Sequence, residues 1–149
     1  MPGARTDIAR PNDEEKRWMA GHQMRALMLG RAHGDPATAI APSFAALDRA
    51  WVTECATLRE NDGDPNPLIQ ALGVALGQHL VDSLGLVWVI ATDPVGTEIA
   101  VHEPAGDTLV YPLNLVAKRW ERREGAFLAA LARAMTEDIT RLKQGLPPR

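Results

Sequence analysis

Residues 66–92 constrain the fold most, because an apolar helix pattern is followed at once by an apolar strand pattern. Leucine and isoleucine recur at three- and four-residue spacing from Leu68 to Leu84, which is typical of a helix with one buried face. Gly85 can end this helix, and the run LVWVIAT that follows is β-branched or aromatic without polar alternation. Such a run is typical of a strand covered on both faces. The segment therefore predicts a helix packed on a sheet.

Two glycines, Gly73 and Gly77, lie four residues apart on this predicted helix. Each costs about 1 kcal/mol of helix propensity but lets another backbone approach closely. In a membrane span the spacing would indicate dimerisation, but polar residues on the same helix exclude a span: Gln70, Gln78, His79 and Asp82. We expect the two glycines to pack closely on a strand.

Two further strands are predicted, each after a tight turn. The sequence DPVG places Pro94 second and Gly96 fourth in a turn, and TEIAVHE then alternates between apolar and polar residues. A second turn, PAGD, leads into TLVYP. Short strands with tight connections form an antiparallel meander of three strands. Its most apolar strand would lie at an edge, where we expect an N-terminal helix or a second copy of the chain to cover it.

The N-terminal part predicts a flexible segment over residues 1–10 and a pair of helices over residues 11–60. Asn12, with Glu15 three positions later, forms a capping box that opens the first helix, which runs to about Ala32. Pro42 fits the first turn of the second helix. The expected buried stripe of that helix is Phe44, Leu47, Trp51, Cys55 and Leu58.

The stretch YPLNLVAKRW predicts the change from the last strand to a helix. Pro112 has no amide hydrogen to give to a sheet, so the strand ends there, and Asn114 is expected to cap the helix. Apolar residues of this helix should face the core, while the basic residues point mainly outward: Lys118, Arg119, Arg122 and Arg123. One more amphipathic helix follows. The expected fold is α+β, with N-terminal helices, a three-stranded antiparallel meander and C-terminal helices packed on one sheet face.

All 149 residues are expected to form one compact globule, with an α+β region over residues 64–143 after the turn-rich stretch ENDGDPNP. No apolar run is long enough for a membrane span. The single cysteine, Cys55, makes no internal disulfide and, on an apolar stripe, is expected to be inert. MPGARTDIAR lacks the apolar centre of a secretory signal, so the cytoplasm is the expected location.

The charge balance bears on the class of partner. A net charge of −3 is opposite in sign to the basic excess of a typical nucleic-acid binder. The basic stretch KRWERRE is the one place where phosphate or RNA could bind, through charge and stacking. Glu121 and Glu124 within it form ordinary helical ion pairs and favour a solvated helix face. We therefore do not expect nucleic acid as a partner.

The segments LIQALGVALGQHLVDSLGLVWVIATD and GTEIAVHEPAGDTLVYPLNLVAKRWE resemble a bacterial family catalogued as domain of unknown function 3806. The resemblance runs from about Asp64 to Leu142, and YPLNLVAKRWE is its most specific part. The family often has an aromatic residue where this chain has DPVG, so Pro94 and Val95 depart from its pattern. No activity or catalytic residue comes with the family, and the resemblance implies a fold alone.

Several polar side chains are candidates for a site. His79 and Asp82 lie three residues apart on the third predicted helix, which puts an imidazole and a carboxylate on one face. Asn114 lies where a strand ends and a helix starts, a position that often borders a binding cleft. The residues selected as ligand-binding candidates are Asn114, Lys118, Arg119, His79, Asp82, Glu98 and His102.

Standard catalytic motifs do not occur: the sequence has no HExxH, Walker loop, dinucleotide glycine fingerprint or Gly-x-Ser-x-Gly elbow. We therefore assign no catalytic residue, no metal ligand and no cofactor. The expected function is a non-enzymatic binding or protein-interaction module, whose sheet face or strand edge meets a protein partner or a second copy. The alternative is a small-ligand-binding protein or an enzyme with a cleft formed by His79, Asp82, Glu98, His102 and Arg119.

Overall fold

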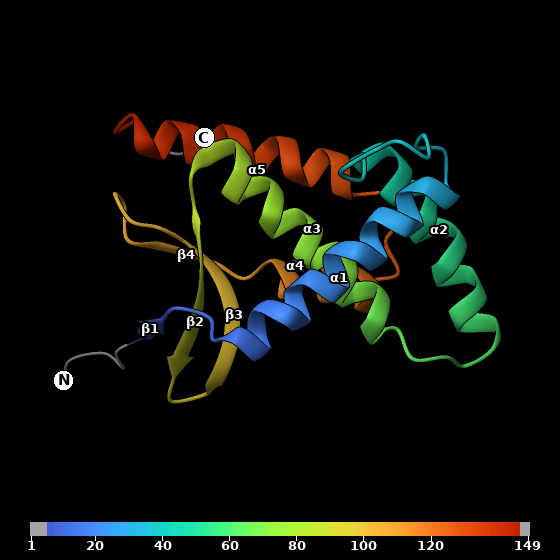
Figure 1. Ribbon diagram of the computed structural model, residues 1–149, viewed down its shortest axis with the longest axis horizontal. Helices are drawn as coiled ribbons and strands as arrows, with labels where there is room; N and C mark the ends of the chain where they lie inside the picture. The colour runs from blue at the N-terminus through green and yellow to red at the C-terminus, as the bar shows by residue number, and fades with distance from the viewer. Residues whose placement is uncertain (1–5, 147–149) are drawn as a thin grey trace.

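The computed structural model describes residues 6–146, which form five helices and one four-stranded antiparallel sheet (Figure 1). The elements in chain order are β1 (Asp7–Ala9), α1 (Asp13–Ala32), α2 (Phe44–Glu60), α3 (Asn66–Leu84), β2 (Val87–Asp93), β3 (Gly96–Glu103), β4 (Thr108–Val110), α4 (Pro112–Glu121) and α5 (Leu128–Lys143). In Figure 1 the sheet lies at one end of the molecule, and α1, α3 and α5 extend between it and α2. The expected α+β class is confirmed, with four strands in place of three.

The start of α1 follows the predicted capping box. Asn12 Oδ1 accepts a hydrogen bond from Glu15 N, and Asn12 N donates one to Glu15 Oε1, both at 2.8 Å. These bonds satisfy backbone donors that have no partner within the helix. The first turn is acidic, which suits the positive end of the helix dipole: Asp13, Glu14 and Glu15. The helix ends at Ala32, as predicted.

The second helix begins at Phe44, two residues after Pro42, because Ser43 caps its start. Ser43 Oγ accepts from Ala46 N at 3.1 Å, which makes Ser43 the N-cap of α2. Asp35, in the connection from α1, accepts from both Ser43 N (2.8 Å) and Ser43 Oγ (2.6 Å). The predicted stripe is confirmed: Leu47 and Trp51 are buried, and Phe44, Cys55 and Leu58 pack against them half-buried.

The two glycines of α3 allow close contacts on two different elements. A Cβ at Gly77 would overlap the indole ring of Trp88 in β2, so this glycine packs on a strand as predicted. A Cβ at Gly73 would lie 2.8 Å from Leu113 Cα, so this glycine instead receives the start of α4. Gly85 ends α3 in the left-handed conformation, with φ of 72°. The glycine spacing therefore places the sheet and α4 side by side on α3.

The sheet has the order β1-β2-β3-β4 and is antiparallel throughout, so the predicted meander of β2, β3 and β4 is confirmed. The additional strand is β1, which pairs with β2 through Ile8 opposite Ala91. Residues 7–9 are therefore not part of a flexible segment, and residues 1–5 of the predicted flexible segment lie outside the described residues. This short strand pairs with the edge of β2 over residues 90–92, where an N-terminal helix or a second copy was expected. A strand of three residues is too short to show the alternating pattern from which strands are predicted.

Helices pack on one face of the sheet. α3 lies against β2 and β3, α4 lies against β3, and α5 joins them in a small cluster that consists of Leu80, Leu86, Val101 and Ile139. The sheet carries a second cluster of buried residues, which consists of Val89, Ala91 and Ala100. Leu109 and Tyr111 pack against this cluster. β2 therefore has covered residues on both faces in its middle, as predicted, while Val87 at its start is 47% exposed.

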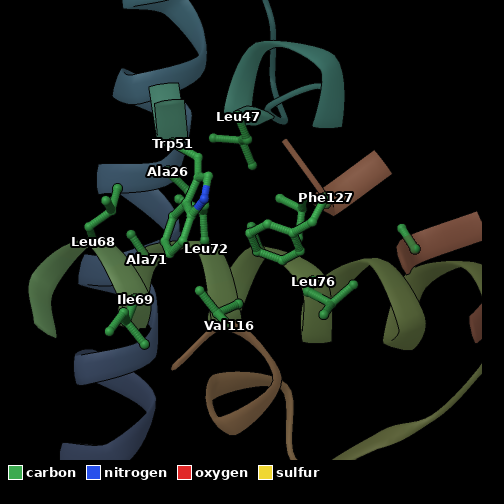
Figure 2. Packing of buried hydrophobic residues seen from close by; sticks show 13 residues of the cluster. Ala26, Leu47, Trp51, Leu68, Ile69, Ala71, Leu72, Leu76, Val116 and Phe127 are labelled. Atoms are coloured by element: carbon green, nitrogen blue, oxygen red, sulfur yellow. The ribbon is translucent and has the colours of Figure 1, made fainter. Parts of the chain in front are cut away.

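Trp51 lies in the middle of the largest core cluster (Figure 2). Its ring meets those of Phe127 and Trp120 edge-on, at centroid distances of 5.1 and 6.5 Å, and its Nε1 donates to Glu124 O at 3.0 Å. Figure 2 shows side chains of several helices converging here, including Leu47, Leu72, Leu76 and Val116. Full burial of a side chain of this size contributes about 2–3 kcal/mol. The helices thus have their own core, next to the one they share with the sheet.

The start of α5 is capped by a side chain from another helix. Asp48 of α2 accepts from Phe127 N (2.9 Å) and Leu128 N (2.6 Å) through Oδ1, and from Ala129 N (3.0 Å) through Oδ2. Phe127 stands at the N-cap position of α5 and makes no capping bond of its own. A carboxylate at a helix N-terminus is favoured by the helix dipole as well as by these bonds. Asp48 therefore joins the N-terminal and C-terminal helices.

Candidate functional site

A cleft of about 500 Å³ opens between the first turns of α1 and the end of the sheet near the β2–β3 turn. We call it the α1–sheet cleft. Its walls come from α1, from β2 and β3, and from the passage between β4 and α4. The lining residues are Glu14, Glu15, Trp18, Ile90, Thr97, Glu98, Ile99, Tyr111, Leu113 and Asn114.

Apolar side chains form a large part of the cleft surface. Ile90 and Ile99 are register partners on neighbouring strands and line the cleft together. Leu113 lines it as well, and its backbone is held close to α3 by Gly73. Trp18, which is 38% exposed, adds an aromatic wall from α1. An apolar cleft with a few polar groups at its rim is the usual form of a binding site.

Asn114 and Glu98 meet at the rim of this cleft. Asn114 Nδ2 donates a hydrogen bond to Glu98 Oε2 at 2.8 Å, which joins α4 to β3. The prediction that Asn114 caps the helix is wrong, because Pro112 occupies the first position of α4 and Tyr111 the N-cap position. Proline is well suited to that first position, since it has no amide hydrogen to leave unpaired and its φ is already helical. Asn114 therefore lies inside the helix, and its side chain is turned to the sheet.

Carboxylates surround the apolar surface of the cleft. Glu14 and Glu15 are present because acidic residues are favoured in the first turn of α1, and Glu98 is on the opposite wall. Glu15 also serves the capping box, and Glu98 accepts from Asn114. Both partners are neutral, so these bonds leave the negative charges in place.

The pKa of the Tyr111 phenol depends on the burial and the charges in this region. Burial raises the pKa of its phenol, and the nearby negative charges of Asp93 and Glu98 raise it further. Each of the two causes disfavours the phenolate. At neutral pH the hydroxyl is therefore protonated, and an occupant of the cleft meets a neutral donor on this wall.

A second hollow, of about 310 Å³, adjoins the cleft. The two share Thr97, Glu98, Tyr111 and Asn114, so they lie next to each other across these residues. The second hollow continues over the β2–β3 turn, where it is lined by Ala91, Asp93, Val95 and Gly96. Asp93 Oδ1 holds this turn by accepting from Val95 N (2.8 Å) and Gly96 N (3.0 Å). Together the two hollows form a groove that passes around the end of the sheet.

Two of the predicted site residues, His79 and Asp82, line a different groove, of about 690 Å³, between α1, α3 and the start of α2. The His79 ring packs edge-on against Phe44, with 4.9 Å between centroids, and its nitrogens lie 3.3 Å from Ser83 Oγ and 3.4 Å from Thr136 Oγ1. Asp82 accepts from Gln78 instead. The imidazole and the carboxylate thus have separate partners.

Gln78 is the centre of the polar network in that groove. Its Oε1 accepts from Gln23 Nε2 (2.8 Å) and Trp88 Nε1 (3.0 Å), and its Nε2 donates to Asp82 at 2.9 Å. A network whose members satisfy one another stabilises the packing of α1, α3 and β2. We therefore assign His79 and Asp82 a structural part in this groove.

The other predicted candidates lie apart from the cleft. His102 Nε2 is 2.8 Å from Asp107 Oδ1, across the turn between β3 and β4. Lys118 is exposed on α4, four residues after Asn114. Arg119 does not point outward as expected: only 19% of its side chain is exposed, and its guanidinium lies 5.8 Å from the Phe127 ring centroid.

Arg119 and Glu124 form an ion pair, with 3.1 Å between Nε and Oε2, although the geometry gives Nε no hydrogen bond. The predicted cleft of histidine, aspartate, glutamate and arginine is therefore not assembled: Glu98 is in the α1–sheet cleft, and His79, Asp82, His102 and Arg119 line other parts of the molecule. Of the seven candidates, the structure brings together Asn114 and Glu98.

Sequence reasoning named two of the ten lining residues, Glu98 and Asn114, and missed the other eight, among them Glu14, Trp18 and Tyr111. A signal was available for one of them, because a tryptophan in the polar first turns of α1, next to the buried Met19, has no place in the core pattern. The signal for Tyr111 is weaker, since an aromatic residue at a strand end is common in any sheet.

Residues 6–146 contain no group of three or more histidine, cysteine, aspartate or glutamate side chains placed to hold a metal ion. Within the same range, no helix has the length and apolar character needed to cross a membrane.

The fold and the cleft define a small α+β domain, with helices on one sheet face and a groove at one end of the sheet. The chain belongs to the family described as Domain of unknown function (DUF3806), whose family model matches residues 50–127, more than half of the chain. The matched residues include the strands and the start of α4 that line the cleft, whereas α1 lies outside them. No curated protein and no solved structure matches the chain.

Proposed function

We propose that this protein is a non-enzymatic binding module of the cytoplasm, and that it holds a segment of a partner protein in the α1–sheet cleft. The observation that carries the proposal is the combination of an apolar cleft surface, Ile90, Ile99 and Leu113, with Trp18 standing exposed beside it. Exposed aromatic side chains next to apolar clefts supply most of the binding energy in many protein interfaces.

The polar groups of the cleft support binding more than catalysis. Glu15 is engaged in the capping box, Glu98 in the bond to Asn114, and Tyr111 is held protonated by a raised pKa. A general base needs a positioned partner or nucleophile within hydrogen-bond reach. The hydrogen bonds of Glu15 and Glu98 serve the fold instead, so the enzyme alternative has less support.

Self-association through the edge of β2 has less support over residues 90–92, because β1 already pairs with them. A second copy of the chain in the cleft itself is one outcome of the experiment below. The cytoplasmic location is proposed from the single cysteine, which makes no internal disulfide.

The experiment is a selection of random peptides displayed on phage against the purified full chain, followed by measurement of each enriched peptide on two variants. Trp18→Ala removes the aromatic wall of the cleft. Met28→Ala is the matched control, since Met28 is 56% exposed on the same helix and does not line the cleft. We expect peptides that bind the wild type and the control but lose at least about tenfold in affinity on Trp18→Ala.

Enriched peptides that bind all three proteins equally would contradict the proposal. Light scattering over the same concentration range separates the occupants, because a dimer that is lost in Trp18→Ala would identify a second copy in place of a separate partner.

A further inference from the structure

We propose that the partner segment is basic: an extended stretch that inserts an apolar or aromatic side chain into the α1–sheet cleft and carries lysine or arginine beside it. This inference rests on the proposed function and specifies the class of partner.

The charges along the groove support this choice of occupant. Four carboxylates line the cleft and the adjoining hollow: Glu14, Glu15, Asp93 and Glu98. Within residues 6–146, no lysine, arginine or histidine lines either hollow. Lys16 and Arg17 follow on α1, but they line neither. A groove with charge of one sign attracts a segment of the other sign and repels acidic ones.

The hydrogen bonds that these carboxylates accept do not come from cationic groups. Three of the four carboxylates accept hydrogen bonds from neutral donors. Glu15 accepts from Asn12 N, Asp93 accepts from Val95 N and Gly96 N, and Glu98 accepts from the Asn114 side-chain amide. In the part of the chain that the structure describes, none of the four forms an ion pair. A cationic partner would therefore compensate charges that the protein itself leaves uncompensated.

The shape of the groove favours an extended segment. The cleft and the adjoining hollow share residues and continue around the end of the sheet, past Tyr111 and Glu98. A compact small molecule could fill one of the two hollows, whereas a chain several residues long can occupy both. Its apolar side chain would fill the space between Trp18 and Ile99, and cationic side chains on either side would reach Glu14 on one wall and Asp93 beyond the other.

The raised pKa of Tyr111 agrees with this arrangement. Its causes include the negative charges of Asp93 and Glu98, which shows that these two carboxylates act at the place where the hollows meet. A cation bound there would oppose their effect and lower the pKa of the Tyr111 phenol. This change gives a spectroscopic readout that an uncharged occupant would not produce.

The test uses two labelled peptides of equal length, acetylated and amidated, each with a central Leu-Phe pair. Lysines flank the pair in one peptide, and glutamines flank it in the other. Fluorescence anisotropy with the full chain should give the lysine peptide an affinity about tenfold higher, as expected for two or three exposed ion pairs. This advantage should shrink as the salt concentration rises from about 0.05 to about 0.5 M.

The variant that tests the charges is Glu14→Gln combined with Glu98→Gln, in which the new amide oxygen at position 98 can still accept from Asn114. We expect the affinity advantage of the lysine peptide over the glutamine peptide to fall to about twofold or less in this variant. The matched control is Glu60→Gln with Glu121→Gln, which removes the same charge from exposed positions outside the groove. This control should keep the full advantage.

The outcomes separate this inference from the proposed function. If both peptides bind the wild type equally and both lose affinity in Trp18→Ala, the cleft binds a partner but the partner is not selected for positive charge, which overturns the inference alone. A lysine peptide that fails to bind, or that binds the charge variant as well as the wild type, also overturns it. If binding of the lysine peptide is unaffected by Trp18→Ala, the cleft is not the binding site and both proposals fail.

Discussion

The indole ring of Trp88 lies directly against the backbone of Gly77, and its Nε1 donates a hydrogen bond to Gln78 Oε1 at 3.0 Å. A Cβ at position 77 would come within 2.7 Å of Trp88 Cζ2 and closer still to Cη2. This hydrogen bond holds the rigid indole ring in place, so the ring cannot easily move away from an added Cβ. One glycine and one tryptophan thus set the distance between α3 and β2.

Gly77→Ala should therefore destabilise the protein. Overpacking a closely fitted contact costs about 1–3 kcal/mol, which exceeds the gain of up to about 1 kcal/mol from replacing a helical glycine. Urea unfolding followed by circular dichroism should give a lower midpoint. Gly21→Ala is the control, because nothing lies within 4 Å of the Cβ there, and it should raise the free energy of unfolding. Equal effects of the two substitutions would contradict the contact described.

Asp48→Ala should weaken the attachment of α5 to α2. Three backbone N–H groups, from Phe127, Leu128 and Ala129, lose their acceptor, and we expect the free energy of unfolding to fall by about 2 kcal/mol. Asp138→Ala, on the exposed face of α5, should change it by less than about 0.5 kcal/mol. Thermal unfolding of both variants measures the difference, and a loss no larger than the control would show that the cap is dispensable.

Asp35 should make stability depend on pH in the acidic range. Its pKa lies below the ordinary value of 3.8, first because of the hydrogen bond from the Ser43 side chain, with the backbone amide of Ser43 and Arg49 acting in the same direction. A carboxylate with a lowered folded-state pKa contributes stability above its unfolded pKa and loses it as the pH falls through the folded value. Asp35→Asn should therefore be less stable than wild type at about pH 6, and the difference should shrink as the pH falls below 3.8 and through the lower folded-state pKa.

The matched control for this prediction is Asp138→Asn, which removes a carboxylate from an exposed position of α5. Melting temperatures of the three proteins across the pH series provide the measurement. A gap between wild type and Asp35→Asn that stays constant over the acidic range would contradict the assigned cause.

The Cys55 thiol should react slowly. Burial raises its pKa from 9.0 to about 11, against a smaller opposing effect of Arg59. The thiolate fraction at neutral pH should then be about a hundredfold lower than that of an unperturbed cysteine. Rates of alkylation by iodoacetamide test this, with a Cys55→Ala, Ala56→Cys double variant as the comparison, since position 56 is exposed. Similar rates for the two proteins would show that Cys55 is accessible and ionisable.

Local signals account for the correct part of the sequence prediction. The capping box of Asn12 and Glu15, the left-handed Gly85 and the turn held by Asp93 depend on residues a few positions apart, and each is present. The interval of four between Gly73 and Gly77 likewise indicated close packing. It could not indicate that Gly73 would receive the start of α4 in place of a strand, because that depends on the tertiary arrangement.

The errors have the same origin. Asn114 has the side chain of a good N-cap, but Pro112 already supplies a favourable first position, so the helix starts earlier and the asparagine amide bonds to Glu98. Trp18 and Tyr111 come together in one cleft because α1 returns to the end of the sheet, a long-range relationship that no local pattern contains. Two of the ten residues that line the cleft, Glu98 and Asn114, were named from the sequence, and only as isolated residues.

The three-residue strand β1 has a consequence for what can enter the cleft. Residues 10–12 alone connect it to α1, and three residues span at most about 10 Å. Because β1 is paired with β2, the first turn of α1 cannot swing away from the sheet without opening that pairing. The tether limits the aperture of the cleft, so a partner segment of the kind proposed would have to be thin enough to enter it.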